Sequence, residues 1–269
     1  MSALCKQLKR TRQSYYKALK RQTQNLQTSQ KLMKLIQPIR QLMPRLGGRK
    51  LLYMIQEQLV KNEVQMGRDR FFHWLRGQDL LIWPKRAYIN TTQSHHRFWV
   101  YDNLIEGLSL DKPNQLWVSD ITYLRTRDGF CYLALITDAF SRKIVGYDVS
   151  DSLELQGCLR ALKSALQTAS DLGQLIHHSD RGFQYCSGQY TYVLKSNNIR
   201  ISMAEKGNCY QNALAERVNG ILKNEFNLDM IFNSTEHAIK TTQQSIYIYN
   251  QHRPHWALGL KTPQYCHAA

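Results

Sequence analysis

The chain has 269 residues and a formal net charge of +16, with 36 Lys and Arg against 20 Asp and Glu. This excess indicates a polyanionic partner. Apolar runs such as CYLALIT are far too short to span a bilayer, and we find no secretory leader, so we expect a cytoplasmic protein with no membrane partner. The six cysteines form no CxxC pair, which predicts reduced thiols and excludes the usual zinc spacings.

The charge is concentrated in the first part of the chain. Residues 1–112 carry 21 Lys and Arg against 7 acids, and the remainder carries 15 against 13. The first acid is Glu57. Residues 1–48 are therefore predicted to form a basic helical arm for DNA binding and assembly, with helices at 3–27 and 30–43 and Pro38 bending or splitting the second. The predicted DNA contacts in this arm are Arg10, Arg12 and Lys17.

A second helical segment is predicted at residues 49–83. Helices at 49–61 and 67–76, joined by a short turn, resemble a helix-turn-helix that could dock in a major groove. Its aromatic residues are expected to be core, and residues 80–83 are expected to form a small strand. Residues 84–112 have no clear periodicity and are predicted to be a linker. The DNA contacts predicted in the second helix are Arg68, Arg70 and Arg76.

The hydrophobic period changes after residue 112. LWVSDITYL, FCYLALITDAF and SRKIVGYDVS predict three strands joined by short connections, which indicates an antiparallel meander. An amphipathic helix, the strand LIHHS, a helix at 187–197, the strand IRISM and a helix at 211–226 follow. This order predicts an α/β fold for residues 113–269, in which the fourth strand can lie beside the first.

Three carboxylates stand out in this second half. Asp120 lies in the first strand, Asp180 closes the fourth, and Glu216 lies on the 211–226 helix after an interval of 35 residues, 181–215. Oxygen ligands of this kind suit divalent cations such as Mg²⁺. Two such ions can hold the attacking and leaving oxygens of a phosphoryl transfer. The pattern therefore indicates a metal-dependent enzyme that cuts and joins DNA.

The 211–226 helix supports the third ligand by its periodicity. Leu214, Val218, Ile221 and Leu222 predict the buried stripe. The opposite, polar face is predicted to present Asn212, Glu216, Asn219 and Lys223 away from the core.

The chain resembles the insertion-sequence transposases whose catalytic core is similar to retroviral integrase, with a ribonuclease H-like fold. The resemblance is carried by WVSDITYL, ITDAFSRKIVGY, HHSDRGFQY, SMAEKGNCYQNALAE, LKNEF and YNQHRPHWALGLKTPQY, which span most of residues 117–265. Upstream, GRKLL, GRDRFFHWLR and TTQSHH resemble the helical region that precedes this core. The resemblance implies a mixed sheet with helices on both faces, preceded by an all-α basic region.

The resemblance also implies the chemistry and the partners. Asp120, Asp180 and Glu216 would be the catalytic, metal-binding triad, with two Mg²⁺ per site and Mn²⁺ able to substitute. The partners would be double-stranded DNA, as transposon ends and target, and further copies of the chain in a dimer or larger assembly. The setting would be the cytoplasm of a bacterium, on the nucleoid. Further expected DNA contacts are Arg181, Lys206, Asn212, Asn219, Lys223 and Arg253.

Some residues receive other expectations, and the chain departs from the pattern in places. Asp138, before the turn at Ser141 and Arg142, is expected to be structural. His177 and His178 are adjacent in a strand and point to opposite faces, so they do not predict a metal pair, although His178 could lie near the phosphate. The family often has an acid where this chain has Gln211.

Relatives also shape the expectation for end recognition. Many of them join this part to an upstream helix-turn-helix and leucine zipper by translational frameshifting. No sustained heptad run precedes the core in this chain, so end recognition would need a second polypeptide or a fused form. The His/Cys zinc domain of retroviral integrases has no counterpart here.

Two alternatives remain open at this point. The first is a catalytically inactive, DNA-binding regulator of transposition that retains the integrase-like fold, against which the intact triad argues. The second is a serine or tyrosine recombinase, but no Arg/His constellation accompanies the many Ser and Tyr residues.

Overall fold

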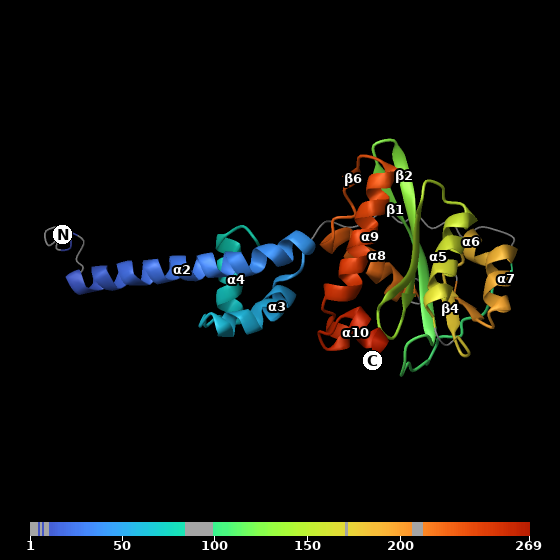
Figure 1. The fold of residues 1–269 in the computed structure, drawn as a ribbon, viewed down its shortest axis with the longest axis horizontal. Helices are drawn as coiled ribbons and strands as arrows, with labels where there is room; N and C mark the ends of the chain where they lie inside the picture. The colour runs from blue at the N-terminus through green and yellow to red at the C-terminus, as the bar shows by residue number, and fades with distance from the viewer. Residues whose placement is uncertain (1–4, 6, 8–10, 84–98, 170–171, 206–211) are drawn as a thin grey trace. The chain divides into compact units, whose positions relative to one another are not determined.

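The computed structural model describes residues 5, 7, 11–83, 99–169, 172–205 and 212–269. The chain folds as two compact units, Met1–Pro84 and Lys85–Ala269 (Figure 1). The predicted DNA contacts Arg10 and Lys206, and the departure at Gln211, lie outside the described residues. The finer boundary predicted at residue 48 stays a prediction.

Over residues 11–83, the first unit contains three helices. They are α2 (Arg12–Leu42), α3 (Gly48–Lys61) and α4 (Arg68–Gly77). The α2 helix begins at a Thr11 cap, whose hydroxyl oxygen accepts a hydrogen bond from the Ser14 amide over 3.1 Å. It continues through Pro38, so the two helices predicted at 3–27 and 30–43 are one helix over the described residues. Burial of Leu32 and Ile36 anchors this stretch despite the hydrogen bond that a proline removes.

The core of the first unit lies where the three helices meet. Leu32 of α2, Ile55 of α3 and Phe71 of α4 are almost completely buried there, which confirms Phe71 as a core residue. Residues 80–83 form no strand, contrary to the prediction. Their backbone carbonyls accept side-chain hydrogen bonds instead, Leu80 from Arg40 over 3.2 Å and Trp83 from Arg45 over 2.9 Å.

The N-terminal part of α2 is exposed to solvent. Residues 15–27 are exposed on every side of the helix. This segment carries Lys17, Lys20 and Arg21 and no acid. None of the described helices is both long enough and apolar enough to cross a membrane.

A six-stranded mixed sheet forms the centre of the second unit. The strands β1 (Leu116–Thr126), β2 (Gly129–Asp138) and β3 (Ile144–Ser150) form the predicted antiparallel meander. On the other side of β1, β4 (Ile176–Ser179) and β5 (Arg200–Met203) are parallel to it, giving the order β3-β2-β1-β4-β5. The short β6 (Ile231–Phe232), which the sequence did not predict, pairs with the far end of β1. The prediction that the fourth strand lies beside the first is confirmed.

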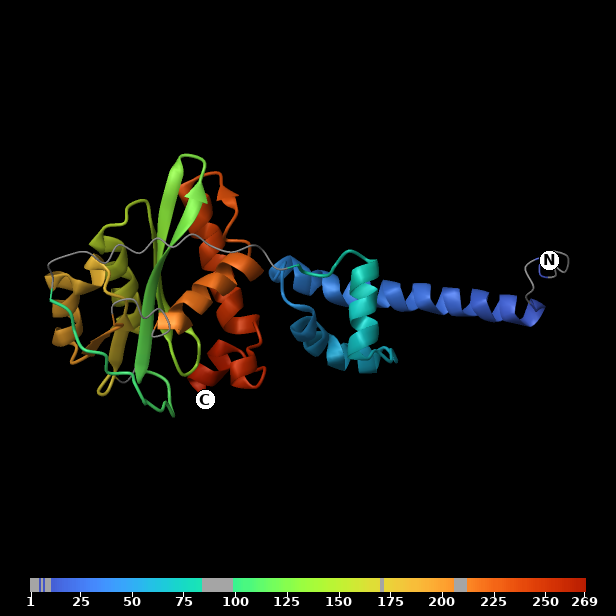
Figure 2. The ribbon, with the colours of Figure 1, turned by 180° about the vertical axis from the view of Figure 1, so that it is seen from behind.

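Helices cover both faces of this sheet, as predicted for a ribonuclease H-like core (Figure 2). On one face, Trp117 packs with apolar residues of α5 (Leu155–Thr168), α6 (Phe183–Cys186) and α7 (Gly188–Ser196). On the other, Val118 packs with Ala215 of α8 (Ala213–Glu225), and α9 (Thr235–His252) lies on the same side. A 3-10 turn (Trp256–Leu258) and α10 (Pro263–Ala268) follow. Because successive strand residues alternate between faces, β1 directs Val118 and Asp120 toward α8.

Candidate active site

The sheet places the two aspartates at one edge. In the parallel pair β1–β4, Ser119 is the register partner of Ser179. Asp120 and Asp180 are the residues that follow these serines, so both leave the paired region at the same end. The register of these two strands therefore places the two aspartates next to one another, as predicted.

The third carboxylate comes from α8. This helix packs on the sheet through the buried side chains of Ala215, Val218 and Leu222. Glu216 lies in its first turn and is exposed. One turn later, the Asn219 side-chain amide donates a hydrogen bond to Oδ2 of Asp120 over 2.8 Å, which fixes the helix against the strand at the level of that carboxylate.

The electrostatics of Asp120 show that the charges of both other acids act on it. Burial and, to a smaller extent, the charges of Asp180 and Glu216 together raise the pKa of Asp120 from 3.8 to about 7, against the hydrogen bonds from Asn219 and the Ile121 amide, which lower it. Within the described ranges, no three His, Cys, Asp or Glu side chains form a ready-made metal cage. Charges interact over longer distances than those at which side chains bind one metal ion. The three acids can therefore lie in the same region without being close enough to form a metal site in this conformation.

The orientation of α8 differs from the prediction. Its buried stripe is Ala215, Val218, Asn219 and Leu222, while Leu214 and Ile221 are only partly buried. The helix is turned so that its asparagines face the sheet. The predicted solvent-facing polar face is therefore wrong for Asn212 and Asn219.

The two asparagines contact the strand that carries Asp120. The Asn212 amide donates to the Ser119 backbone carbonyl over 3.2 Å, beside the Asn219–Asp120 hydrogen bond. Both side chains are about 95 % buried. Their amides are thus committed to β1, and burial does not favour the predicted contacts with DNA.

Lys223 continues the α8 surface toward the same carboxylate. Burial lowers the pKa of its ammonium group, and the negative charge of Asp120 acts in the opposite direction. Lys223 is half-buried, so a cation lies near the acids while keeping access to solvent.

The two histidines of β4 have separate partners. His177 Nε2 is 2.7 Å from the Ser119 hydroxyl and 3.0 Å from the Tyr190 hydroxyl, and burial lowers its pKa to about 3. His178 Nδ1 is 2.8 Å from the Ser202 hydroxyl. The two rings therefore point to opposite faces, as predicted, and do not form a metal pair.

Two arginines predicted to contact DNA, Arg181 and Arg253, form hydrogen bonds within the second unit. Arg181 Nε donates to the Ala204 carbonyl over 2.7 Å. Arg253 is only 3 % exposed, and its guanidinium donates to both oxygens of Glu225 over 2.8 and 2.7 Å. It also lies over the Tyr249 ring, 5.7 Å from the centroid. This arginine holds α8 and the end of α9 together, and its burial does not favour the predicted contact with DNA.

Asp138 has the structural role expected for it. Its carboxylate accepts hydrogen bonds from the Asn114 amide over 2.8 Å and from both the amide and the hydroxyl of Ser141. Burial alone would raise the pKa of Asp138, but hydrogen bonds, including that with His267, lower it overall.

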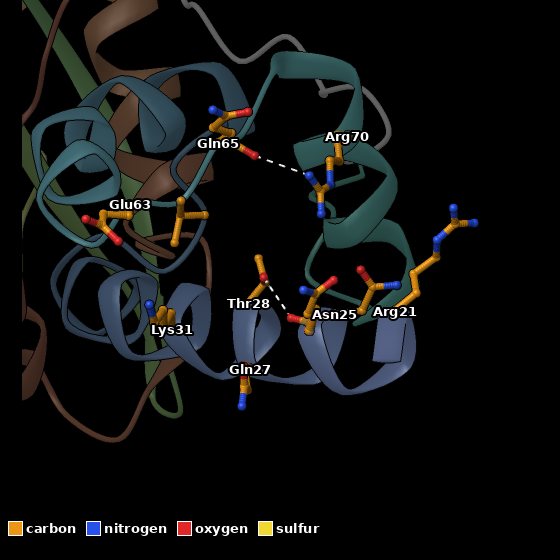
Figure 3. Close-up of a pocket in the computed structure, with 10 residues that line it drawn as sticks. Arg21, Asn25, Gln27, Thr28, Lys31, Glu63, Gln65 and Arg70 are labelled. Carbon is orange, nitrogen blue, oxygen red and sulfur yellow. Dashed lines mark hydrogen bonds between the residues drawn. The ribbon is translucent and has the colours of Figure 1, made fainter. Parts of the chain in front are cut away.

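The cations predicted in the first unit lie on exposed surfaces. Arg12, Lys17, Arg68, Arg70 and Arg76 are exposed, with Arg68 paired to Asp69 over 2.8 Å. Arg70 lines a polar hollow of about 770 Å³ between α2 and the start of α4 (Figure 3). Arg21 and Lys31 of α2 line the same hollow, and the sequence did not single them out. Their helical spacing along an acid-free segment was the available signal.

Retroviral integrases are among the solved structures that resemble this chain. The HTLV-2 integrase catalytic core domain in complex with magnesium has a TM-score of 0.46 and 22 % identity, covering 58 % of this chain and 97 % of that one. A simian T-cell lymphotropic virus intasome in complex with the PP2A regulatory subunit B56 gamma has a TM-score of 0.49 and 17 % identity, covering 83 % and 71 %.

Sequence comparison gives a closer relationship. Two families described as Integrase core domain match residues 111–209 and 197–263. The insertion element IS600 uncharacterized 31 kDa protein of Shigella sonnei is 37 % identical over 211 residues, covering 78 % of each chain. Transposase InsF for insertion sequence IS3A of Escherichia coli (strain K12) is 38 % identical over 194 residues, covering 71 % of this chain and 67 % of the relative. The chain therefore belongs to the family of insertion-sequence transposases that carry an integrase core domain.

Proposed function

We propose that this transposase cuts DNA at transposon ends and joins the freed 3′-hydroxyl to a second phosphodiester, with Asp120, Asp180 and Glu216 as the ligands of two divalent cations. The observation that carries the proposal is the convergence of charge on Asp120, whose pKa is raised by burial and by both other carboxylates. Such an arrangement disfavours three negative charges at neutral pH unless a cation compensates them.

The residues at this edge of the sheet fit magnesium. All three candidate ligands are carboxylates, and hard cations take oxygen ligands while keeping waters and substrate phosphates in their remaining positions. When bound, two such ions would supply activation of the attacking oxygen and stabilisation of the leaving 3′ oxygen. Mn²⁺ has similar preferences for oxygen ligands and is expected to substitute.

The protein side chains have distinct tasks in this proposal. Asp120, a residue of the central strand β1 whose carboxylate accepts two hydrogen bonds, would hold the cations together with Asp180, which follows β4, and Glu216 of α8. Lys223 would bind a phosphate of the DNA next to the carboxylates, because its cation lies within reach of Asp120's charge. No covalent intermediate on the protein is required.

DNA binding would be shared between both units. The exposed cations of α2 and α4 supply a surface for the phosphate backbone, with Arg21, Lys31 and Arg70 around one hollow. We further propose that at least two copies assemble, because two ends must be held together for joining, and that an upstream polypeptide, separate or fused, contributes to end recognition. The site of action would be the nucleoid.

The test is a cleavage and joining reaction on DNA that carries the element's own terminal sequences. With Mg²⁺ the chain, with its upstream partner where needed, should release 3′-hydroxyl ends and form joined products. With Ca²⁺ it should bind the same DNA but yield little product, because the looser coordination of calcium fits the reaction poorly. Full activity after replacement of any one of the three acids by its amide would refute the assignment.

A further inference from the structure

Asn219 is attached to the proposed site by one hydrogen bond. Its Nδ2 donates to Oδ2 of Asp120 over 2.8 Å, while the Ile121 backbone amide donates to Oδ1 of the same carboxylate over 2.9 Å. Each oxygen of Asp120 therefore has one donor, and the two donors come from different elements. A carboxylate held at both oxygens has little freedom to rotate about its χ2 torsion.

The rest of the Asn219 side chain has no partner to explain its presence. It is 5 % exposed, and its Oδ1 atom is buried without a hydrogen-bond partner among the described residues. Leaving a buried amide oxygen unsatisfied destabilises the fold, and an apolar side chain of similar shape would avoid that cost. Among the described residues, the one hydrogen bond that this side chain makes is therefore the bond to Asp120.

We propose that Asn219 is a positioning residue that fixes the Asp120 carboxylate in the orientation in which it would bind a divalent cation. This inference rests on the proposed function, because it assigns Asp120 to metal. Groups that hydrogen-bond to metal ligands fix the orientation of those ligands before the metal arrives. Asn219 follows Glu216 by three residues, so one turn of α8 carries both a candidate ligand and the group that orients another.

The competing explanation is that Asn219 only clamps α8 onto β1. Asn212 provides a matched control for that explanation. It precedes α8 by one residue, is 4 % exposed, donates to the neighbouring strand residue Ser119, and also has an unpartnered Oδ1 among the described residues. Its partner is a backbone carbonyl and not a carboxylate. A clamp would therefore be weakened equally by either substitution, whereas positioning of Asp120 depends on Asn219.

The experiment measures Mn²⁺ binding to the full-length chain without DNA, by electron paramagnetic resonance of the free ion. Asn219→Ala and Asn219→Leu should raise the Kd for Mn²⁺ by about 10- to 100-fold, the usual effect of removing a group that orients a ligand. Asn212→Ala should change it by less than about threefold, because Asn212 touches no ligand. Thermal melts verify that each variant is folded, and the leucine variant covers the case in which alanine leaves a destabilising cavity.

Three outcomes separate the two ideas. The positioning role is supported if the wild type binds Mn²⁺, if Asp120→Asn abolishes this binding, and if both Asn219 variants weaken it. The positioning role is overturned if the Asn219 variants bind Mn²⁺ with the same Kd as the wild type, or if Asn212→Ala raises the Kd as much as they do. Either result leaves the proposed function intact. A wild-type chain whose Mn²⁺ binding does not depend on Asp120 overturns the proposed function, and the positioning role with it.

Discussion

Ser119 and Ser179 are the last register partners of the parallel pair β1–β4, so the aspartate that follows each serine lies at the same end of this pairing. This relationship does not depend on loops, because it is set by the backbone ladder of two central strands. It is the structural reason that the charge of Asp180 raises the pKa of Asp120, although the two acids are 60 positions apart in the chain.

Replacement of Asp120 by asparagine should abolish chemistry but leave DNA binding. The substitution keeps the shape of the side chain and removes the negative charge that the proposed cations require, so strand transfer should fall by several orders of magnitude. Gel shifts with end-containing DNA should change little. Asp128→Asn, in the exposed β1–β2 turn, is the control and should keep full activity. Retained strand transfer in the Asp120 variant would remove Asp120 from the triad.

The stability of the metal-free protein should depend on pH through Asp120. The folded-state pKa of this carboxyl is about 7, above its ordinary 3.8, so its contribution to stability is fully present below pH 3.8 and is lost as the pH rises through 7. Melting temperatures in EDTA should therefore fall between about pH 4 and 7 more steeply for the wild type than for Asp120→Asn. Added Mg²⁺ should reduce the difference, since binding to the folded state stabilises it. Equal slopes for both proteins would contradict the raised pKa.

The salt dependence of DNA binding should report on the free half of α2. Replacing Lys17, Lys20 and Arg21 by glutamine should make the plot of log affinity against log salt shallower by about 0.9 for each phosphate that the segment no longer neutralises. Deleting residues 1–50 is not an equivalent test, because Leu32, Ile36 and Met43 belong to the core of the first unit. Lys163→Gln, exposed on α5 of the second unit, serves as the control for removal of a surface charge. An unchanged slope in the triple variant would show that this segment does not bind the phosphates.

Arg253 should matter for stability and not for DNA affinity. Its guanidinium and the Glu225 carboxylate form a two-point pair with little exposure on either side. Arg253→Met should lower the free energy of unfolding by about 3 kcal/mol, as expected when one partner of a buried pair is removed. Urea titration measures this, and Arg127→Met, at an exposed turn position, should cost no more than about 0.5 kcal/mol. Weaker DNA binding at unchanged stability would restore the DNA-binding role.

The sheet could be predicted from the sequence because its signals are local. Alternating apolar residues and short turns define the meander, and the order of helices and strands after it favours β4 beside β1. The continuity of α2 could not be predicted, because Pro38 is a strong local breaker whose effect is offset here by tertiary packing. The two-residue β6 carries too few residues to show any period.

The face of α8 could not be predicted for a different reason. Hydrophobic periodicity assigns asparagine to solvent, whereas Asn212 and Asn219 are buried because β1 offers them a carbonyl and a carboxylate. The pair that Arg253 forms with Glu225 could not be predicted either, since the two residues are far apart in the sequence. In both cases the decisive interaction joins residues far apart in the sequence, at a point where polar groups replace apolar packing.

Side chains of β1 alternate between the two faces of the sheet, so the candidate site depends on the exact number of residues between Trp117 and Asp120. Trp117 packs on the α5 side, and Asp120, three positions later, faces α8. If one residue were inserted between them while Trp117 kept its place, the residue before Asp120 would take its position facing α8. The carboxylate of Asp120 would then point to the other face, into the apolar layer around α5. The strand could still pair with β2 and β4, but the buried carboxylate would destabilise the protein, and the proposed site would lose one of its acids. Length changes that this family tolerates should accordingly accumulate outside β1 and β4, while insertion of a single residue inside either strand should lower both the stability of the protein and its transposition activity.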